Sequence, residues 1–166
     1  MKTLIVMAVL STLAFGATEF GAQVGYWFPT GDAGDVYGGN FYFGGQFLSH
    51  MPLFAIEAAI GYTPLKLDTE VAGVDFSGHI IPIAVGLRSY SGSLYAAGGL
   101  ELDMVSAKTE VLGVETSDTS DNYFGGYIGA GLIAPLVGVG DLDLNARVHF
   151  MDFDDLWMGL CVGINF

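Results

Sequence analysis

The chain has 166 residues, of which 52% are hydrophobic and 14% are charged, and its formal net charge at pH 7 is −13. A protein of this charge repels nucleic acids, so we exclude DNA- and RNA-binding functions. Cys161 is the single cysteine of the sequence, which excludes a disulfide framework and a cysteine-based metal cluster.

The N-terminus has the pattern of a secretory signal peptide. Lys2 supplies the positive charge, residues 3–13 form an apolar stretch, and residues 14–16 (Ala-Phe-Gly) resemble a cleavage site with small residues. The apolar stretch is shorter than the ~20 residues that a transmembrane helix needs. We therefore predict a cleaved signal peptide over residues 1–16 and one mature domain over residues 17–166.

Beyond the leader, the chain divides into eight strand-like segments separated by turn residues. Apolar residues recur with a period of two in each segment, which is typical of strands, and no helical period appears. The segment lengths are close to the ~10 residues of a tilted transmembrane strand. The predicted strands are 19–28, 37–48, 53–64, 79–90, 94–105, 122–136, 142–151 and 156–166.

The links between these segments alternate in length. The short links are 49–52, 91–93 and 137–141. The other links, most of them long and acidic, are 29–36, 66–78, 106–121 and 152–155, of which only the last is short. Outer-membrane barrels place long loops outside the cell and tight turns in the periplasm, whereas a soluble meander has no reason to sort its links in this way.

Each segment has one uncharged apolar face and one face of glycines and polar residues. A soluble lipocalin-like barrel would turn the apolar face inward and would need a charged exterior. The glycine-rich face is a poor exterior for a soluble protein, but it suits the narrow lumen of an eight-stranded membrane barrel. We therefore predict an all-β fold, an eight-stranded antiparallel up-and-down transmembrane β-barrel.

Aromatic residues of the apolar face gather near the strand ends, as in the interfacial girdles of membrane proteins. Those near the long links are Tyr26, Phe28, Tyr37, Tyr62, Phe124 and Phe150; those near the opposite ends are Phe20, Phe47, Phe54 and Phe166. With its leader, its alternating pattern and the terminal Phe166, the chain resembles the small eight-stranded outer-membrane barrels, such as the membrane domain of outer-membrane protein A.

This resemblance implies a location and partners. The location is the outer membrane of a Gram-negative-type bacterium, where the protein contacts outer-membrane lipid and lipopolysaccharide. The C-terminal strand, with Phe166 as assembly signal, is then recognised by the barrel-assembly machinery. The implied role is structural or envelope-related, or an interaction with extracellular ligands through the acidic loops.

Charged residues on the glycine-rich face are the main candidate site. They are Glu57, Arg88, Glu101, Asp103, Asp143 and Arg147. Charges in a lumen of low dielectric constant must be paired, so we expect a structural polar network that plugs the barrel, with Glu57 and Arg88 paired across neighbouring strands. The alternative is a narrow ion-conducting, porin-like channel.

A lipid A-modifying enzyme is a further alternative, which would need a His–Ser pair near the outer interface. His79 follows Ser77 in the spacing Ser-x-His, with no His-x-Ser after it, and His149 lies near Asp152 and Asp154 in the sequence. These patterns are too weak to assign catalytic residues, so we predict a non-enzymatic protein. The acidic loops lack the spacing of a calcium loop, so we predict no metal site and no cofactor.

Overall fold

A computed structural model describes residues 17–67, 74–111, 114–152 and 155–166 of the chain. Residues 1–16, the predicted signal peptide, lie outside the described residues. A short helix and a two-residue strand, α2 (Asp32–Val36) and β2 (Tyr37–Gly38), accompany eight long strands. These are β1 (Thr18–Thr30), β3 (Asn40–His50), β4 (Phe54–Leu67), β5 (Val74–Ser91), β6 (Leu94–Val111), β7 (Val114–Leu136), β8 (Gly140–Met151) and β9 (Asp155–Asn165).

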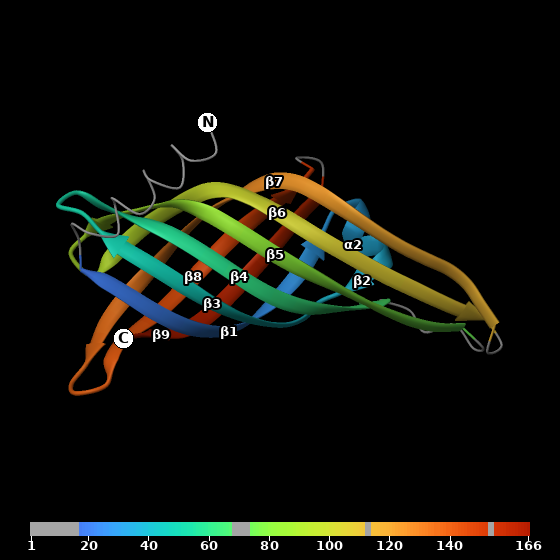
Figure 1. The fold of residues 1–166 in the computed structure, drawn as a ribbon, viewed down its shortest axis with the longest axis horizontal. Helices are drawn as coiled ribbons and strands as arrows, with labels where there is room; N and C mark the ends of the chain where they lie inside the picture. The colour runs from blue at the N-terminus through green and yellow to red at the C-terminus, as the bar shows by residue number, and fades with distance from the viewer. Residues whose placement is uncertain (1–16, 68–73, 112–113, 153–154) are drawn as a thin grey trace, which may run out of the picture.

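The long strands form a closed antiparallel barrel (Figure 1). Each pairs with its neighbours in chain order, β1 pairs with β9, and the pairing of β4 with β5 completes the ring. The predicted fold is therefore confirmed. No helix among the described residues has the length and apolar character needed to cross a membrane.

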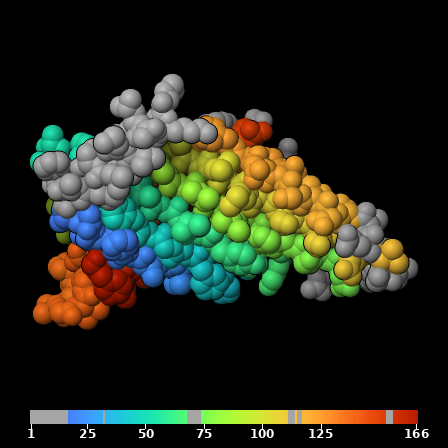
Figure 2. All heavy atoms as spheres, viewed as in Figure 1, coloured from blue at the N-terminus to red at the C-terminus, as the bar shows by residue number. Residues whose placement is uncertain are grey.

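The barrel has two different ends. At the turn end, short turns join β3 to β4, β5 to β6 and β7 to β8, whereas the opposite loop end carries α2. Here the sequence prediction was wrong in three respects, one of which is that residues 74–78 of the predicted link 66–78 belong to β5. Residues 32–36 form a helix, and most of the predicted loop 106–121 is strand, because β6 and β7 stay paired as far as Val111 and Val114. Together with β5, they extend beyond the barrel as a three-stranded sheet (Figures 1 and 2).

The apolar face of the strands points outward, as predicted. Large apolar side chains with half or more of their surface exposed occur around the barrel, including Phe20, Val24, Phe41, Phe43, Ile60, Val85, Leu100, Ile128 and Leu160. Tyr26, Tyr62 and Phe124 are exposed near the loop end, and Phe20 and Phe166 near the turn end. Tyr37 is an exception to the predicted girdle, because it packs against the buried cluster inside the loop end of the barrel.

Inward-facing aromatic rings lie over inward-facing glycines. Gly44 and Gly61 are directly paired across β3 and β4, and a Cβ atom built on either would collide with the ring of Tyr42. The same relation holds between Tyr95 and Gly131. Glycines of the lumen face thus provide the space that large rings fill, which packs the interior of a barrel that is only wide enough for side chains.

We expect Gly61→Ala to destabilise the barrel by about 1–3 kcal/mol, because the added methyl group overpacks the ring of Tyr42. The matched control is Gly45→Ala on the outer face of β3, where a Cβ atom meets nothing closer than the carbonyl oxygen of Gly21 at 3.8 Å. Urea unfolding in lipid vesicles, followed by tryptophan fluorescence, measures both variants. Equal stability of the two variants would contradict this account of the packing.

Candidate functional site

Arg88 of β5 is the centre of a polar network in the lumen and is fully buried. Its Nε donates to Glu57 on β4, and its Nη2 donates to Oε1 of Gln46 on β3 over 2.6 Å. Its Nη1 lies 2.7 Å from Oδ2 of Asp143 on β8, on a part of the barrel wall that is not adjacent to β5. The guanidinium group therefore crosses the lumen and connects four strands.

Glu57 and Asp143 each contact more than one polar side chain. Glu57 Oε1 lies 2.7 Å from Nη1 of Arg147, so this carboxylate bridges two arginines. Asp143 accepts a hydrogen bond from the Tyr95 hydroxyl at 2.6 Å and from Nε2 of Gln46 at 3.1 Å. Two carboxylates thus face two guanidinium groups, and the charges balance within a buried cluster.

Aromatic rings cover the two arginines. Cζ of Arg88 lies 4.4 Å from the ring centroid of Tyr95, and Cζ of Arg147 lies 5.0 Å from that of Tyr127. Both distances are in the range of cation–π contacts, which are stronger where water is excluded. The polar network is therefore enclosed by rings as well as by hydrogen bonds.

Glu101 and Asp103 belong to a second cluster. Nδ1 of His149 lies 2.9 Å from both carboxylate oxygens of Glu101. Asp103 is buried and follows on the inner face of the same strand, β6. The ring of His149 also packs on Trp27 at a centroid distance of 4.1 Å, and Trp27 stacks on Tyr42 at 4.8 Å. The structure thus joins Glu57, Arg88, Asp143 and Arg147 directly, but links Glu101 to His149 instead.

Toward the loop end, the interior of the barrel becomes apolar. Its buried cluster consists of Trp27, Tyr42, Leu65, Ile80, Met151, Trp157 and Cys161. These large side chains depart from the expected inner face of glycines and polar residues. The signal was present, since Trp27 and Tyr42 share the phase of polar residues and lie over inward glycines such as Gly159 and Gly61.

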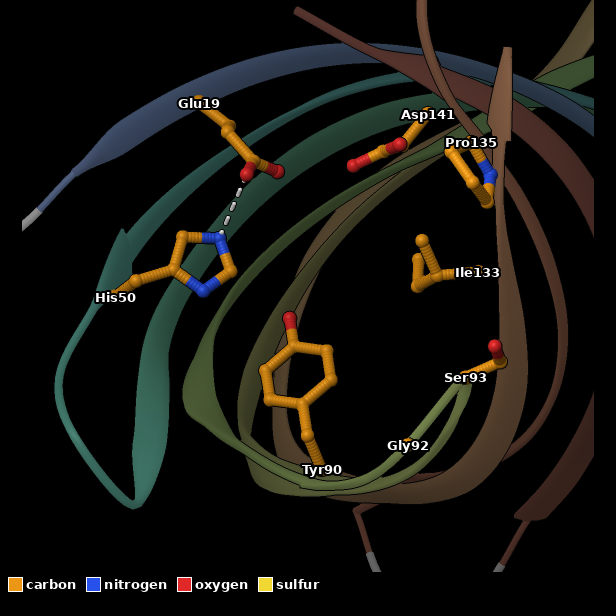
Figure 3. A pocket seen from close by; sticks show the side chains of 8 residues that line it. All are labelled: Glu19, His50, Tyr90, Gly92, Ser93, Ile133, Pro135 and Asp141. Atoms are coloured by element: carbon orange, nitrogen blue, oxygen red, sulfur yellow. Dashed lines mark ion pairs between the residues drawn. The ribbon is translucent and has the colours of Figure 1, made fainter.

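The turn end opens into a cavity of about 330 Å³ (Figure 3). Glu19 and His50 form an ion pair of 3.1 Å on one side of its mouth, and Asp141 lies across from them. The ring of Tyr90 packs against both His50 and Tyr95, at centroid distances of 5.6 and 5.8 Å. Tyr90 in the wall of this cavity therefore contacts Tyr95, whose hydroxyl group donates a hydrogen bond to Asp143 of the polar network.

The two histidines considered for catalysis, His79 and His149, have different partners in the structure, and Asp154 lies outside the described residues. The ring of His79 stacks on Tyr62 at 5.4 Å, and His149 contacts Glu101. Among the described residues, no group of three or more His, Cys, Asp or Glu side chains could hold a metal ion. Phe166 exchanges two backbone hydrogen bonds with Phe20 and exposes its ring on the outside of the barrel.

Comparison with known proteins identifies structural neighbours only. No protein-family model matches the chain. No curated protein sequence matches it either. Neisserial surface protein A has 15% identity and a TM-score of 0.60, over 89% of this chain and 95% of that one. The attachment invasion locus protein Ail of Yersinia pestis, in complex with the heparin analogue sucrose octasulfate, has 15% identity and a TM-score of 0.60, over 90% and 99%.

A third neighbour is the N-terminal β-barrel domain of OprF from Pseudomonas aeruginosa, with 17% identity and a TM-score of 0.54, over 90% of this chain and 97% of that one. The chain therefore has the fold of the small outer-membrane β-barrels.

Proposed function

We propose that this chain is an integral outer-membrane protein of a Gram-negative-type bacterium, in which a plugged, non-enzymatic barrel carries an extracellular sheet that binds a partner. The outer surface of the barrel is the observation that carries the proposal. Apolar side chains such as Val85, Leu100 and Leu160 are more than half exposed. Monomeric soluble proteins rarely expose large contiguous apolar patches, whereas such a surface is required against lipid.

The interior supports a plugged barrel more than a channel. The two arginines are held by carboxylates on opposite parts of the wall, and rings cover them. Between Gln23, Trp27 and Arg147, the remaining cavity is about 10 Å³, roughly the space of one water molecule. An ion would have to displace this network to pass. We therefore favour a structural role for the polar residues.

The sheet beyond the barrel is the surface best placed to meet a partner. β7 pairs with β8 only from Gly126 onward, so residues 117–122 extend past β8 and are exposed. Asp75, Glu110, Asp118 and Asp121 are exposed on the extended strands. Ail was crystallised with a sulfated sugar analogue, but the carboxylates here favour a basic partner over a sulfated one.

This proposal also includes a route of assembly. The exterior contacts lipid and lipopolysaccharide, and the C-terminal strand with Phe166 is recognised by the barrel-assembly machinery. Strands β1 and β9 pair along their length, and Phe166 ends this seam opposite Phe20, so the C-terminal strand supplies one side of the barrel closure.

Cysteine labelling of intact cells tests the location and the orientation together. In a Cys161→Ala background, Val114→Cys places a thiol at the tip of the sheet, and Val137→Cys places one in the turn between β7 and β8. Both parent side chains are highly exposed, 68% and 101%. We expect a maleimide on a large polyethylene glycol, which cannot cross the outer membrane, to label Val114→Cys in intact cells and Val137→Cys only after the envelope is broken.

Cell fractionation provides the control, because it shows whether both variants reach the outer membrane in folded form. We expect both variants in the outer-membrane fraction with the heat-dependent gel mobility of a folded barrel. Labelling of Val137→Cys alone in intact cells would reverse the orientation. Recovery of a folded, detergent-free monomer from the soluble fraction would reject the membrane proposal.

A further inference from the structure

We propose that the loop end of the lumen contains a binding site for a small aromatic molecule. A cavity of about 140 Å³ lies there, beneath α2 and inside the ring of strands. Trp157, Tyr37 and Tyr123 supply aromatic walls, and Leu65, Ile80 and Met151 supply aliphatic ones. This inference does not depend on the location of the barrel in the cell.

Buried hydrophobic side chains form much of the wall of this cavity. Leu65, Ile80, Met151 and Trp157 are all at least nine-tenths buried, although the lumen of a membrane barrel is usually polar. Among the described residues, no side chain that lines this cavity has a buried polar atom without a hydrogen-bond partner. The surface of the cavity includes polar as well as apolar atoms, so the contacts of a ligand with its hydrophobic and aromatic walls, rather than the absence of water, must supply the binding.

The size and the walls of the cavity favour an aromatic ring. An engineered apolar cavity of about 150 Å³ in another protein binds benzene, which sets the scale for the ligand. The ring of Tyr37 lies 6.5 Å from that of Trp157 at an angle of 33°, and both line the cavity. A ring placed between them can make the tilted contacts that aromatic pairs prefer. A long acyl chain exceeds this space.

The small side chain of Ala33 leaves the cavity open on the side of α2. Ala33 is buried, and its carbonyl oxygen accepts the backbone N–H of Tyr37, which closes the last turn of α2. A larger side chain at this position would point into the cavity without disturbing a strand. Val36 lies on the same helix and is half exposed, so it does not share this role.

Bromobenzene is a suitable probe, because its bromine quenches tryptophan fluorescence on contact. The chain has two tryptophans, Trp27 and Trp157, and Trp27 does not line the cavity. The full mature chain with Trp27→Phe is placed in lipid nanodiscs and titrated with bromobenzene. We expect saturable quenching of Trp157, and only linear quenching of Trp27 in the Trp157→Phe protein.

Filling the cavity provides the decisive comparison. We expect Ala33→Leu to weaken the saturable quenching by about tenfold or more, and Val36→Leu to leave it unchanged. If Ala33→Leu does not fold, Val105→Phe fills the same space from β6. Linear quenching in every variant, or saturable quenching that the filling variants do not change, would overturn the proposal. Displacement of bromobenzene by decane as readily as by toluene would reject the selection of an aromatic ring.

Discussion

Replacing Arg88 with alanine is expected to lower the free energy of unfolding by about 3–5 kcal/mol, because it leaves buried carboxylates without their cation. Asp143 would lose its direct guanidinium partner, and Glu57 would keep only Arg147. Arg88, Glu57 and Asp143 are fully buried, so both carboxylates depend on protein groups for their contacts. Urea unfolding in lipid vesicles measures the loss, and the heat-dependent gel shift should move to lower temperature.

Two further variants show whether the loss comes from the orphaned charge. The exposed pair of Lys108 and Asp118, 3.1 Å apart, is the control for a surface contact, and Lys108→Ala should cost about 0–1 kcal/mol. Adding Asp143→Asn to Arg88→Ala removes one uncompensated charge and should recover part of the stability. A double variant less stable than Arg88→Ala alone would exclude charge compensation as the cause.

The fold could be predicted because lipid imposes a simple pattern on the sequence. A residue on the lipid-facing side of a strand, such as Val85, must be apolar, whereas its neighbours Ala84 and Gly86 must fit the lumen. A period of two in the sequence therefore reveals both the strands and the direction in which each face points. The extensions of β6 and β7 follow another rule. These extensions contain exposed serines, threonines and aspartates, a composition that is typical of loops. Backbone pairing between β6 and β7 nevertheless keeps them in strands.

The candidate site was only partly accessible to sequence reasoning. Arg88 and Glu57 lie diagonally on paired strands, since Arg88 pairs with Ala55 and Glu57 pairs with Gly86. Such neighbours can be proposed from strand order alone. The contact of Arg88 with Asp143 crosses the lumen, and it depends on the tilt and register of every strand between them. The contact of Glu101 with His149 spans β7, and the sequence does not identify it because the two residues lie on strands that are not paired with each other.

A single substitution at Val85 tests whether lipid or water covers the outer surface of the barrel. Val85 is 57% exposed on β5, between Ile83, which pairs with Ile60, and Leu87, which pairs with Ile56. If lipid covers this surface, Val85→Arg must place a charge in hydrocarbon, which costs about 2–4 kcal/mol near the middle of a bilayer. In a soluble barrel, the same change would expose a charge to water and cost little.

Val114→Arg is the matched control, because Val114 has a similar apolar side chain that is 68% exposed at the tip of the extended sheet. Beyond the apolar band, the same arginine should cost about 0–1 kcal/mol. The free energies of unfolding in vesicles should therefore separate the two variants, with Val85→Arg clearly less stable. Equal stabilities would show that water reaches Val85 as it reaches Val114, and the membrane location would have to be abandoned even though the barrel fold would stand.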